Sequence, residues 1–186
     1  RFRWKPAGAP VPGKIGLMAI DFENAALIMT EAGSKRQASL YVVQGREGLE
    51  RHDPGGIDVM NIDLATFVAA LQRENHTLKR TLTDPHVFSG IGNAYSDEIL
   101  HAAKLSPFKQ TSGLTDEEAS RLFDATRSVL SDWIDRLQDE TGDDFPEKVT
   151  AFREGMAVHG RYGKPCPVCG SPVQRIAYAS NEANYC

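Results

Sequence analysis

The sequence predicts an α+β protein, in which short β-strands, amphipathic helices and a small β-hairpin follow one another along the chain. Residues 14–45 contain apolar, β-branched runs separated by turn signals. From residue 63 the apolar side chains recur at helical spacing instead. The last 21 residues begin with two cysteines separated by two residues, and strand-forming residues follow them. Because the strands precede the helices and do not alternate with them, the pattern favours α+β over α/β.

Residues 1–57 are predicted to be β structure that ends in a polar linker. Residues 1–4 alternate polar and aromatic side chains, as in a half-buried strand. Three apolar runs follow, at residues 14–22, 25–30 and 38–43. Residues 46–58 are rich in Gly, Arg, Glu, Asp and Pro, with Pro54-Gly55-Gly56 as the expected boundary. We therefore expect three further strands and a domain boundary near residue 57.

Residues 58–150 are predicted to form a helical domain. Apolar side chains at 64, 67, 68 and 71 lie at i, i+3, i+4 and i+7, and Asp63 precedes them as a candidate N-cap. A second helix is expected over residues 94–104, after a glycine-rich turn. A third begins at Thr115, because Thr115 and Glu118 match a capping box, and it runs to about residue 140. Its apolar stripe comprises Leu122, Phe123, Val129, Leu130, Trp133, Ile134 and Leu137.

Composition indicates a soluble globular protein. The 186 residues include 21 Lys and Arg against 25 Asp and Glu, which gives a net charge of −4. Ten of the acidic residues lie in residues 114–145 with only three basic ones, so the rest of the chain is net positive and a basic binding surface stays possible. No apolar run approaches the roughly 20 residues of a membrane span, and the start lacks the apolar stretch of a signal peptide. We expect no membrane partner and a cytoplasmic location.

The three cysteines have the spacing C-x2-C-x16-C, at Cys166, Cys169 and Cys186. A C-x2-C turn aims two thiolates at one tetrahedral ion, and zinc ribbons join two such turns. The second turn would place a fourth cysteine near position 189. Two alternatives stay open: a redox C-x-x-C motif, whose flanks are usually strand and helix, or three unrelated buried cysteines. We predict zinc as the cofactor.

The turn Ser89-Gly90-Ile91-Gly92-Asn93 precedes the second expected helix. Two glycines beside an Asn at a helix start allow backbone N–H groups to approach an anion such as a DNA phosphate, and the helix dipole favours the negative charge. The alternative is an N-cap with a packing glycine. A dinucleotide-binding fingerprint is not predicted, because no strand precedes the turn and no acidic residue follows at the required distance.

Together, the turn and the cysteine module resemble the C-terminal half of the formamidopyrimidine-DNA glycosylase and endonuclease VIII family of base-excision repair enzymes. The resemblance covers roughly residues 60–186. It rests on L-T-D-x3-F-S-G-I-G-N-x-Y-x-D-E at residues 82–98, V-H-G-R-x-G-x-P-C-P-x-C-G at residues 158–170 and Y-C at residues 185–186. The two long motifs occur in the family's order and at a fitting separation, which makes the pair more specific than either motif.

The resemblance implies three domains: the latter part of a β-sandwich at residues 1–57, a helix–two-turn–helix domain at 58–150 and a zinc finger at 151–186. Family members hold damaged double-stranded DNA between these domains and excise the altered base. An N-terminal proline amine attacks C1′ of the flipped nucleotide, and β/δ-elimination then cuts the strand. The Pro-Glu terminus would precede Arg1, so no catalytic residue is assigned in this chain. The resemblance also implies a monomer, bound to DNA in a bacterial cytoplasm.

Residue by residue, the resemblance implies a set of DNA contacts and metal ligands. Asn93 and the glycines before it match the family's phosphate-binding turn, and Lys79 matches a lysine near the DNA backbone. The expected DNA-binding residues are Lys79, Gly90, Gly92, Asn93, Arg161 and Arg175, and the expected zinc ligands are Cys166, Cys169 and Cys186.

Two positions depart from the family pattern. The finger often carries an Arg five residues before the third cysteine, where this chain has Asn181, and the loop at residues 34–37 lacks the Phe of an Arg-x-Phe wedge. Arg36 or Arg175 could replace the missing contacts. Two other functions therefore stay open beside the glycosylase: a non-catalytic nucleic-acid-binding protein, and a structural ribbon with no DNA role.

Overall fold

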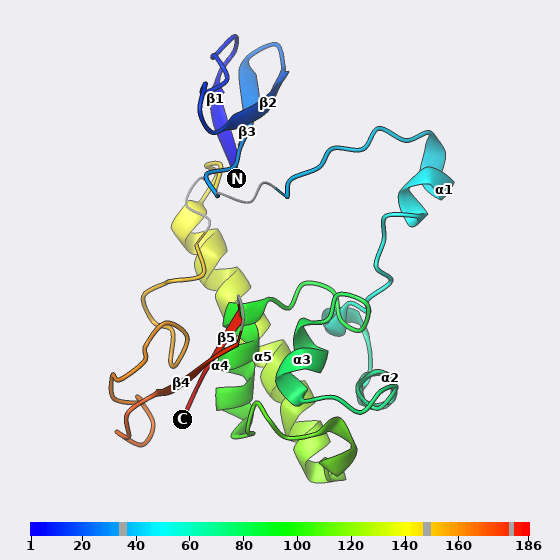
Figure 1. Ribbon diagram of the computed structural model, residues 1–186, viewed down its shortest axis with the longest axis vertical. Helices are drawn as coiled ribbons and strands as arrows, with labels where there is room; N and C mark the ends of the chain where they lie inside the picture. Colours follow the sequence, from blue (N-terminus) through cyan, green and yellow to red (C-terminus); the bar gives the residue numbers. More distant parts are fainter. Residues whose placement is uncertain (34–36, 147–149, 179–180) are drawn as a thin grey trace. The chain divides into compact units, whose positions relative to one another are not determined.

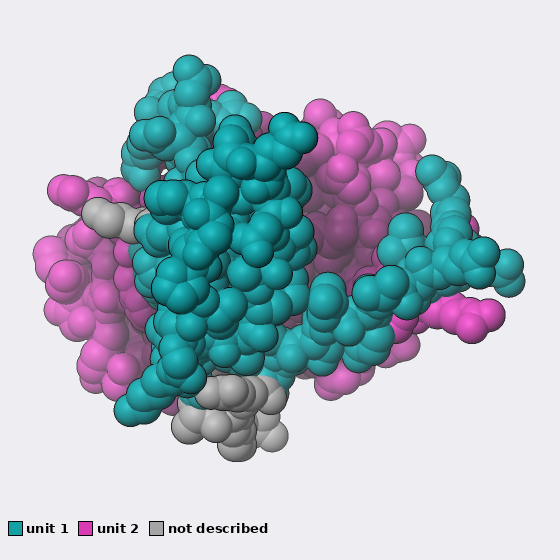
Figure 2. Space-filling view, turned by 90° about the horizontal axis from the view of Figure 1, so that it is seen from above, with its two compact units in different colours: residues 1–49, 137–150 teal, residues 50–136, 151–186 magenta. Residues whose placement is uncertain are grey.

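A computed structural model describes residues 1–33, 37–146, 150–178 and 181–186, which form two compact units (Figure 1, Figure 2). One unit comprises residues 1–49 and 137–150, and the other comprises residues 50–136 and 151–186. The predicted domain boundaries at 57 and 150 stay predictions. Among the described residues, no helix is both long enough and apolar enough to cross a membrane.

The first unit contains an antiparallel sheet of three strands, β1 (Phe2–Pro6), β2 (Gly16–Asp21) and β3 (Ala25–Thr30), in the order β1-β3-β2. Trp4 of β1 and Ile20 of β2 both pair with Leu27 of the central strand, so these three residues form one row across the sheet. The Trp4 ring lies 5.6 Å from that of Phe22 and stacks on Phe145 at 5.8 Å. The strands predicted around residues 1–4, 14–22 and 25–30 are thus confirmed.

The strand predicted at residues 38–43 is wrong. These residues form no regular structure, and Val42 is 93% exposed. β1 and β2 are the outer strands of the sheet, and neither pairs with this run. An apolar run becomes a strand only where a neighbour accepts its hydrogen bonds and covers one face. The expected linker also contains a short helix, α1 (Gly45–Glu50).

The second unit is built on helices α2 (Leu64–Leu71), α3 (Leu78–Thr83), α4 (Asn93–Ala103) and α5 (Asp116–Thr141). A short 3₁₀ turn, Val59–Asn61, precedes α2, and a second, Thr111–Gly113, lies between α4 and α5. Phe67 of α2 is fully buried, with its ring 5.0 Å from Phe88 and 5.2 Å from Phe123. The side chain of Asp63 accepts the Thr66 N–H at 2.8 Å, so the predicted N-cap is confirmed.

The long helix α5 follows the predicted capping box. The Thr115 hydroxyl accepts the Glu118 N–H at 3.2 Å, and Glu118 accepts the Thr115 N–H at 2.9 Å. The predicted apolar stripe is only partly buried: Leu122, Phe123 and Trp133 are buried, whereas Ile134 is 45% exposed. Ile134 follows Trp133 directly and therefore points about 100° away from it around the helix. At this position only the side of the helix that carries Trp133 is covered by other residues.

The C-terminal hairpin consists of β4 (Gln174–Tyr178) and β5 (Asn181–Tyr185), paired antiparallel, and β5 packs against α4 (Figure 1). Strands, helices and hairpin therefore follow the predicted order, and the α+β class is confirmed.

Candidate nucleic-acid interface and metal centre

The turn before α4 leaves the start of that helix open. Gly90 has φ +81°, in the left-handed region that favours glycine, whereas Gly92 is extended and forms the N-cap without a side-chain hydrogen bond. A Cβ at either glycine would meet no atom within 4 Å, so neither is required for packing. Because the N-cap residue has no side chain, it does not cap the first-turn N–H groups itself, and a helix start of this kind suits an anion. The alternative interpretation of this turn is thus correct in part: Gly92 is the N-cap, but neither glycine is needed for packing. The phosphate contact stays a prediction.

Lys79 on α3 holds this turn from inside. Its Nζ donates to the Asn93 carbonyl oxygen at 2.7 Å, to Ser96 Oγ at 2.8 Å and to Asp97 Oδ1 at 2.6 Å. These bonds use all three donors of the ammonium group. Burial lowers the pKa of Lys79, and the Asp97 carboxylate opposes that shift. Lys79 thus positions the N-terminus of α4, and its predicted DNA contact stays a prediction.

Asp97 extends this network to the C-terminal hairpin. Its side chain is fully buried, and its Oδ2 lies 2.8 Å from His159 Nδ1 and 3.3 Å from Asn184 Nδ2. Asn184 belongs to β5, so one carboxylate joins α3, α4, the loop before the finger and the hairpin. A buried carboxylate needs such partners, because leaving it unpaired costs on the order of several kcal/mol.

Glu98, the next residue, fixes the same loop through its backbone. Its carboxylate accepts three main-chain N–H groups at 2.6–2.9 Å, those of Ala157, Val158 and His159. The Asp-Glu pair in the first motif and the His-Gly-Arg run in the second are therefore in direct contact.

A groove of about 740 Å³ opens beside the turn, between α3, the start of α4, the loop after α4 and the hairpin. It is lined by Thr77, Lys79, Arg80, Thr83, Gly92, Asn93, Pro107, Phe108, Ile176, Glu182 and Ala183. Arg80 is exposed and, within the part of the chain that the structure describes, its guanidinium has no ion pair or hydrogen bond. The groove therefore combines an exposed cation with a helix start that no side chain caps, which suits an anionic ligand.

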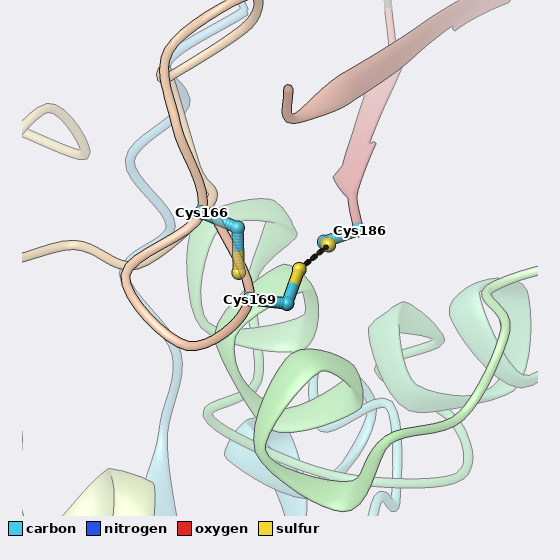
Figure 3. Close-up of side chains that lie close together, drawn as sticks. All are labelled: Cys166, Cys169 and Cys186. Atoms are coloured by element: carbon cyan, nitrogen blue, oxygen red, sulfur yellow. Dashed lines mark hydrogen bonds between the residues drawn. The ribbon is translucent and has the colours of Figure 1, made fainter. Parts of the chain in front are cut away.

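The cysteines form one cluster, as Figure 3 shows. The three Sγ atoms lie within 4.8 Å of one another, and those of Cys169 and Cys186 are 3.2 Å apart. Sulfurs around a tetrahedral zinc ion would be roughly 3.8 Å apart for Zn–S bonds of about 2.3 Å, so the donors fit that metal. Cys169 and Cys186 are exposed, which excludes three unrelated buried thiols, and no helix begins at the C-x-x-C.

Hydrogen bonds among the cysteines and from nearby residues shift the pKa values of these thiols. Hydrogen bonds from Ser171, and then from Cys186, lower the pKa of Cys169 to about 7, toward the thiolate form that binds metal. The neighbouring Cys169 raises the pKa of Cys186 to about 12. His101 of α4 places Nε2 3.3 Å from the Sγ of the buried Cys166, at hydrogen-bonding distance.

Comparison with known proteins agrees with this geometry. The family described as "Formamidopyrimidine-DNA glycosylase H2TH domain" matches residues 56–143. A Mycobacterium tuberculosis protein named "Uncharacterized formamidopyrimidine-DNA glycosylase-like protein" is 41% identical over 133 residues, which cover 72% of this chain and 80% of that protein. The chain belongs to the formamidopyrimidine-DNA glycosylase family.

Other family members are longer. The formamidopyrimidine-DNA glycosylase of Thermus thermophilus is 38% identical over 124 residues, which cover 64% of this chain and 46% of that enzyme. The chain thus spans about half the length of this relative. The crystal structure of MutM (Fpg) from the same organism matches with a TM-score of 0.71 at 28% identity, over 98% of this chain and 70% of that one. A structure titled "Structure of MutM in complex with carbocyclic 8-oxo-G containing DNA" shares the fold, with a TM-score of 0.81 at 22% identity. The match covers 100% of this chain and 69% of that one.

Two arginines predicted to bind DNA, Arg161 of the second motif and Arg175 as a replacement for a missing contact, lie outside the groove lining. Arg175 stacks over Tyr162 at 4.6 Å and lies 4.0 Å from the Glu182 carboxylate. Arg161 is half-buried and donates to the Pro165 carbonyl oxygen at 3.4 Å. Its Nε is buried and has no partner among the described residues. Their DNA contacts stay predictions, and Arg36 and residues 34–36 as a whole lie outside the described residues.

Sequence reasoning missed four residues at these sites: Arg80, His101, Phe108 and Glu182. Arg80 adjoins Lys79, and Phe108 follows a proline in a polar loop, but neither pattern is specific. His101 and Glu182 have no sequence signal, because their partners lie 65 residues away or across the hairpin.

Proposed function

We propose that this chain is the DNA-gripping part of a DNA repair glycosylase. The supporting observation is the groove, where Arg80 and the open start of α4 at Gly92–Asn93 lie on one surface. Two chemical features suit a phosphate there: an exposed guanidinium, and backbone N–H groups with the positive end of a helix dipole. The protein acts as a monomer on damaged double-stranded DNA in the bacterial cytoplasm.

Zinc is part of the same proposal. Cys166, Cys169 and Cys186 would hold the ion, with a fourth cysteine expected near position 189. A zinc ion at this site is structural, since it stabilises a hairpin that has little core of its own. The chain's own residues then determine where the hairpin lies, because Asn184 and Asp97 join it to the helices.

The full-length protein is proposed to be a glycosylase with AP-lyase activity, and no residue of this chain is given a catalytic role. Borohydride trapping of the full-length protein on DNA with an abasic site tests this activity, since a Schiff base becomes a stable covalent adduct. An adduct is expected. If a full-length protein with an N-terminal Pro-Glu gave none, the lyase assignment would fail.

A non-catalytic DNA-binding protein is the second candidate, and one observation favours it. The 133 matched residues make up 80% of the Mycobacterium relative, whereas 124 matched residues make up 46% of the Thermus glycosylase. A protein of the former length has little room for a further domain. DNA binding without a trapped adduct would support this candidate over the glycosylase.

Binding by the groove is tested with Arg80→Ala and Asn93→Ala, and Arg73→Ala serves as the control because Arg73 is an exposed arginine that does not line the groove. Each groove variant should weaken DNA binding by about 1–3 kcal/mol, uniformly across sequences. Arg80→Ala should also reduce the salt dependence by about one counterion. If Arg80→Ala and Asn93→Ala lost no DNA-binding affinity, or lost no more than Arg73→Ala does, the proposed grip would be contradicted.

A further inference from the structure

One histidine of α4 contacts the candidate metal centre. His101 places its Nε2 atom 3.3 Å from Cys166 Sγ. The two residues are 65 positions apart in the chain, so only the packing of the C-terminal hairpin on α4 brings them together. The contact joins a helix directly to a candidate zinc ligand.

Cys166 differs from the other two cysteines in its surroundings. It is only 4% exposed, whereas Cys169 and Cys186 are exposed. Water can stabilise the negative charge on the sulfurs of the exposed pair, but a buried thiolate needs hydrogen-bond donors from the protein. The Val168 N–H and His101 Nε2 supply them, at 3.4 and 3.3 Å from Cys166 Sγ.

Metal binding determines the direction of the histidine hydrogen bond. A cysteine bound to zinc is a thiolate, so its sulfur has no proton and can only accept. Nε2 of His101 must therefore carry the proton and donate to Cys166 Sγ. The bond removes part of the negative charge from that sulfur and fixes its orientation.

His101 lies beside the metal ligands and not among them. The ligands of one tetrahedral zinc ion lie within about 4 Å of one another. In the described part of the chain, the group of candidate ligands whose donor atoms all lie within 4.8 Å contains the three cysteines and no histidine. Any effect of His101 on the metal therefore passes through Cys166.

Other contacts hold the same face of α4 against the finger. Asp97 and His101 are four residues apart and so lie on one face of the helix. Asp97 binds Asn184 of β5, and Glu98 accepts the Val158 N–H. These bonds involve no sulfur, so replacing His101 leaves the attachment of the finger to α4 in place.

We propose that His101 is a positioning residue of the zinc site, whose Nε2–H holds the Cys166 thiolate in the orientation that binds the metal. This inference rests on the proposed zinc site, since it assumes a metal on Cys166. Residues that hydrogen-bond a metal ligand contribute about 10- to 100-fold to metal affinity. Loss of His101 should therefore weaken zinc binding without detaching the finger.

Zinc affinity is measured on the full-length protein by competition with a chelating dye. His101→Phe keeps a ring of similar size but has no N–H, and it should lower the affinity by about 10- to 100-fold. His101→Gln keeps an N–H group at a similar reach and should restore most of the affinity. Arg121→Met is the control and should bind zinc like the parent, because it removes a bond of 2.7 Å to the Ala103 carbonyl oxygen, at the same end of α4.

Cobalt(II) in place of zinc gives a signal that packing alone does not move. A thiolate without its hydrogen bond gives up electron density more easily, so the sulfur-to-cobalt charge-transfer band should lie at longer wavelength in His101→Phe. The band of His101→Gln should lie near that of the parent. An unmoved band in His101→Phe would overturn the proposal whatever the affinity, and d–d bands of a different coordination number would overturn it by showing direct ligation. A parent protein that binds no metal would refute the proposed zinc site and this inference with it.

Discussion

Lys79 and Arg80 are adjacent cations of α3 with opposite surroundings. The Lys79 side chain is 15% exposed, and the three donors of its ammonium group bind Asn93, Ser96 and Asp97. Arg80 is exposed on the groove and makes no hydrogen bond or ion pair through its guanidinium among the described residues, although its charge acts on the Asp84 carboxylate. A buried ion pair contributes mainly by avoiding an unpaired charge, whereas an exposed arginine costs nothing to leave free and stays available to a ligand. One residue step along a helix therefore separates a positioning role from a binding role.

Lys79→Met should destabilise the protein by about 3–5 kcal/mol, because it leaves the buried Asp97 carboxylate without its cation. Arg80→Met should change stability by less than about 0.5 kcal/mol, as exposed substitutions usually do. Urea unfolding of both variants measures the difference. Similar stabilities for the two variants would show that the Lys79–Asp97 pair is not needed for folding.

At the scale of the element, α5 begins with a cap that also binds the preceding loop. Glu118 accepts the Thr115 N–H, and its other oxygen lies 2.5 Å from Lys109 Nζ. The Lys109 hydrogen bond, and then the backbone bond from Thr115, lower the pKa of Glu118. Since the folded protein has the lower pKa, this carboxylate stabilises the fold above its unfolded pKa of about 4.5, and the contribution disappears as the pH falls through the folded value.

Glu118→Gln keeps a side chain that can cap the helix but removes the charge that binds Lys109. It should lower the free energy of unfolding near pH 7, and the difference from the parent should shrink as the pH falls below about 4.5. Denaturant unfolding at several pH values measures this trend, with Asp124→Asn as the control because Asp124 is an exposed carboxylate of the same helix. A difference that grows at low pH would refute the ion pair's role.

At the scale of the molecule, the second unit depends on contacts between distant segments. Asp97 and Glu98 bind residues 157–159, Asn184 joins β5 to Asp97, and His101 reaches Cys166 across 65 positions. The hairpin has only a small core of its own, formed by Val158, Cys166 and Val173. Metal binding to the cysteines should therefore stabilise the helices as well as the finger.

Cys169→Ser should remove zinc and lower the stability of the helical part by at least about 2 kcal/mol, which corresponds to roughly 4–8 °C in Tm for a chain of this size. Metal analysis gives the zinc content, and far-ultraviolet circular dichroism follows the helices during heating. Val168→Ala is the control, because Val168 is an exposed residue of the same turn. Stoichiometric zinc in Cys169→Ser would refute the ligand assignment, and zinc loss with an unchanged helical Tm would refute the coupling.

The sequence by itself determined the features that depend on local spacing. The Asp63 and Thr115 caps, the start of α4 at the glycine turn and the C-x2-C knuckle each follow from residues within one turn of one another. Hydrogen bonds over such short separations form whatever the rest of the chain does. The two motifs also predicted the family. Neither motif by itself showed that Asp97 and Glu98 of the first bind the loop that carries His159 of the second.

The tertiary structure alone decided which residues meet. It left residues 38–43 without a partner strand among the described residues, although their apolar pattern is that of a strand. It turned Lys79 inward and left Arg80 open, and it brought Phe108 and Glu182 into one groove from segments 74 positions apart. Burial and charge pairing depend on the whole packed arrangement, so no local pattern of residues encodes them.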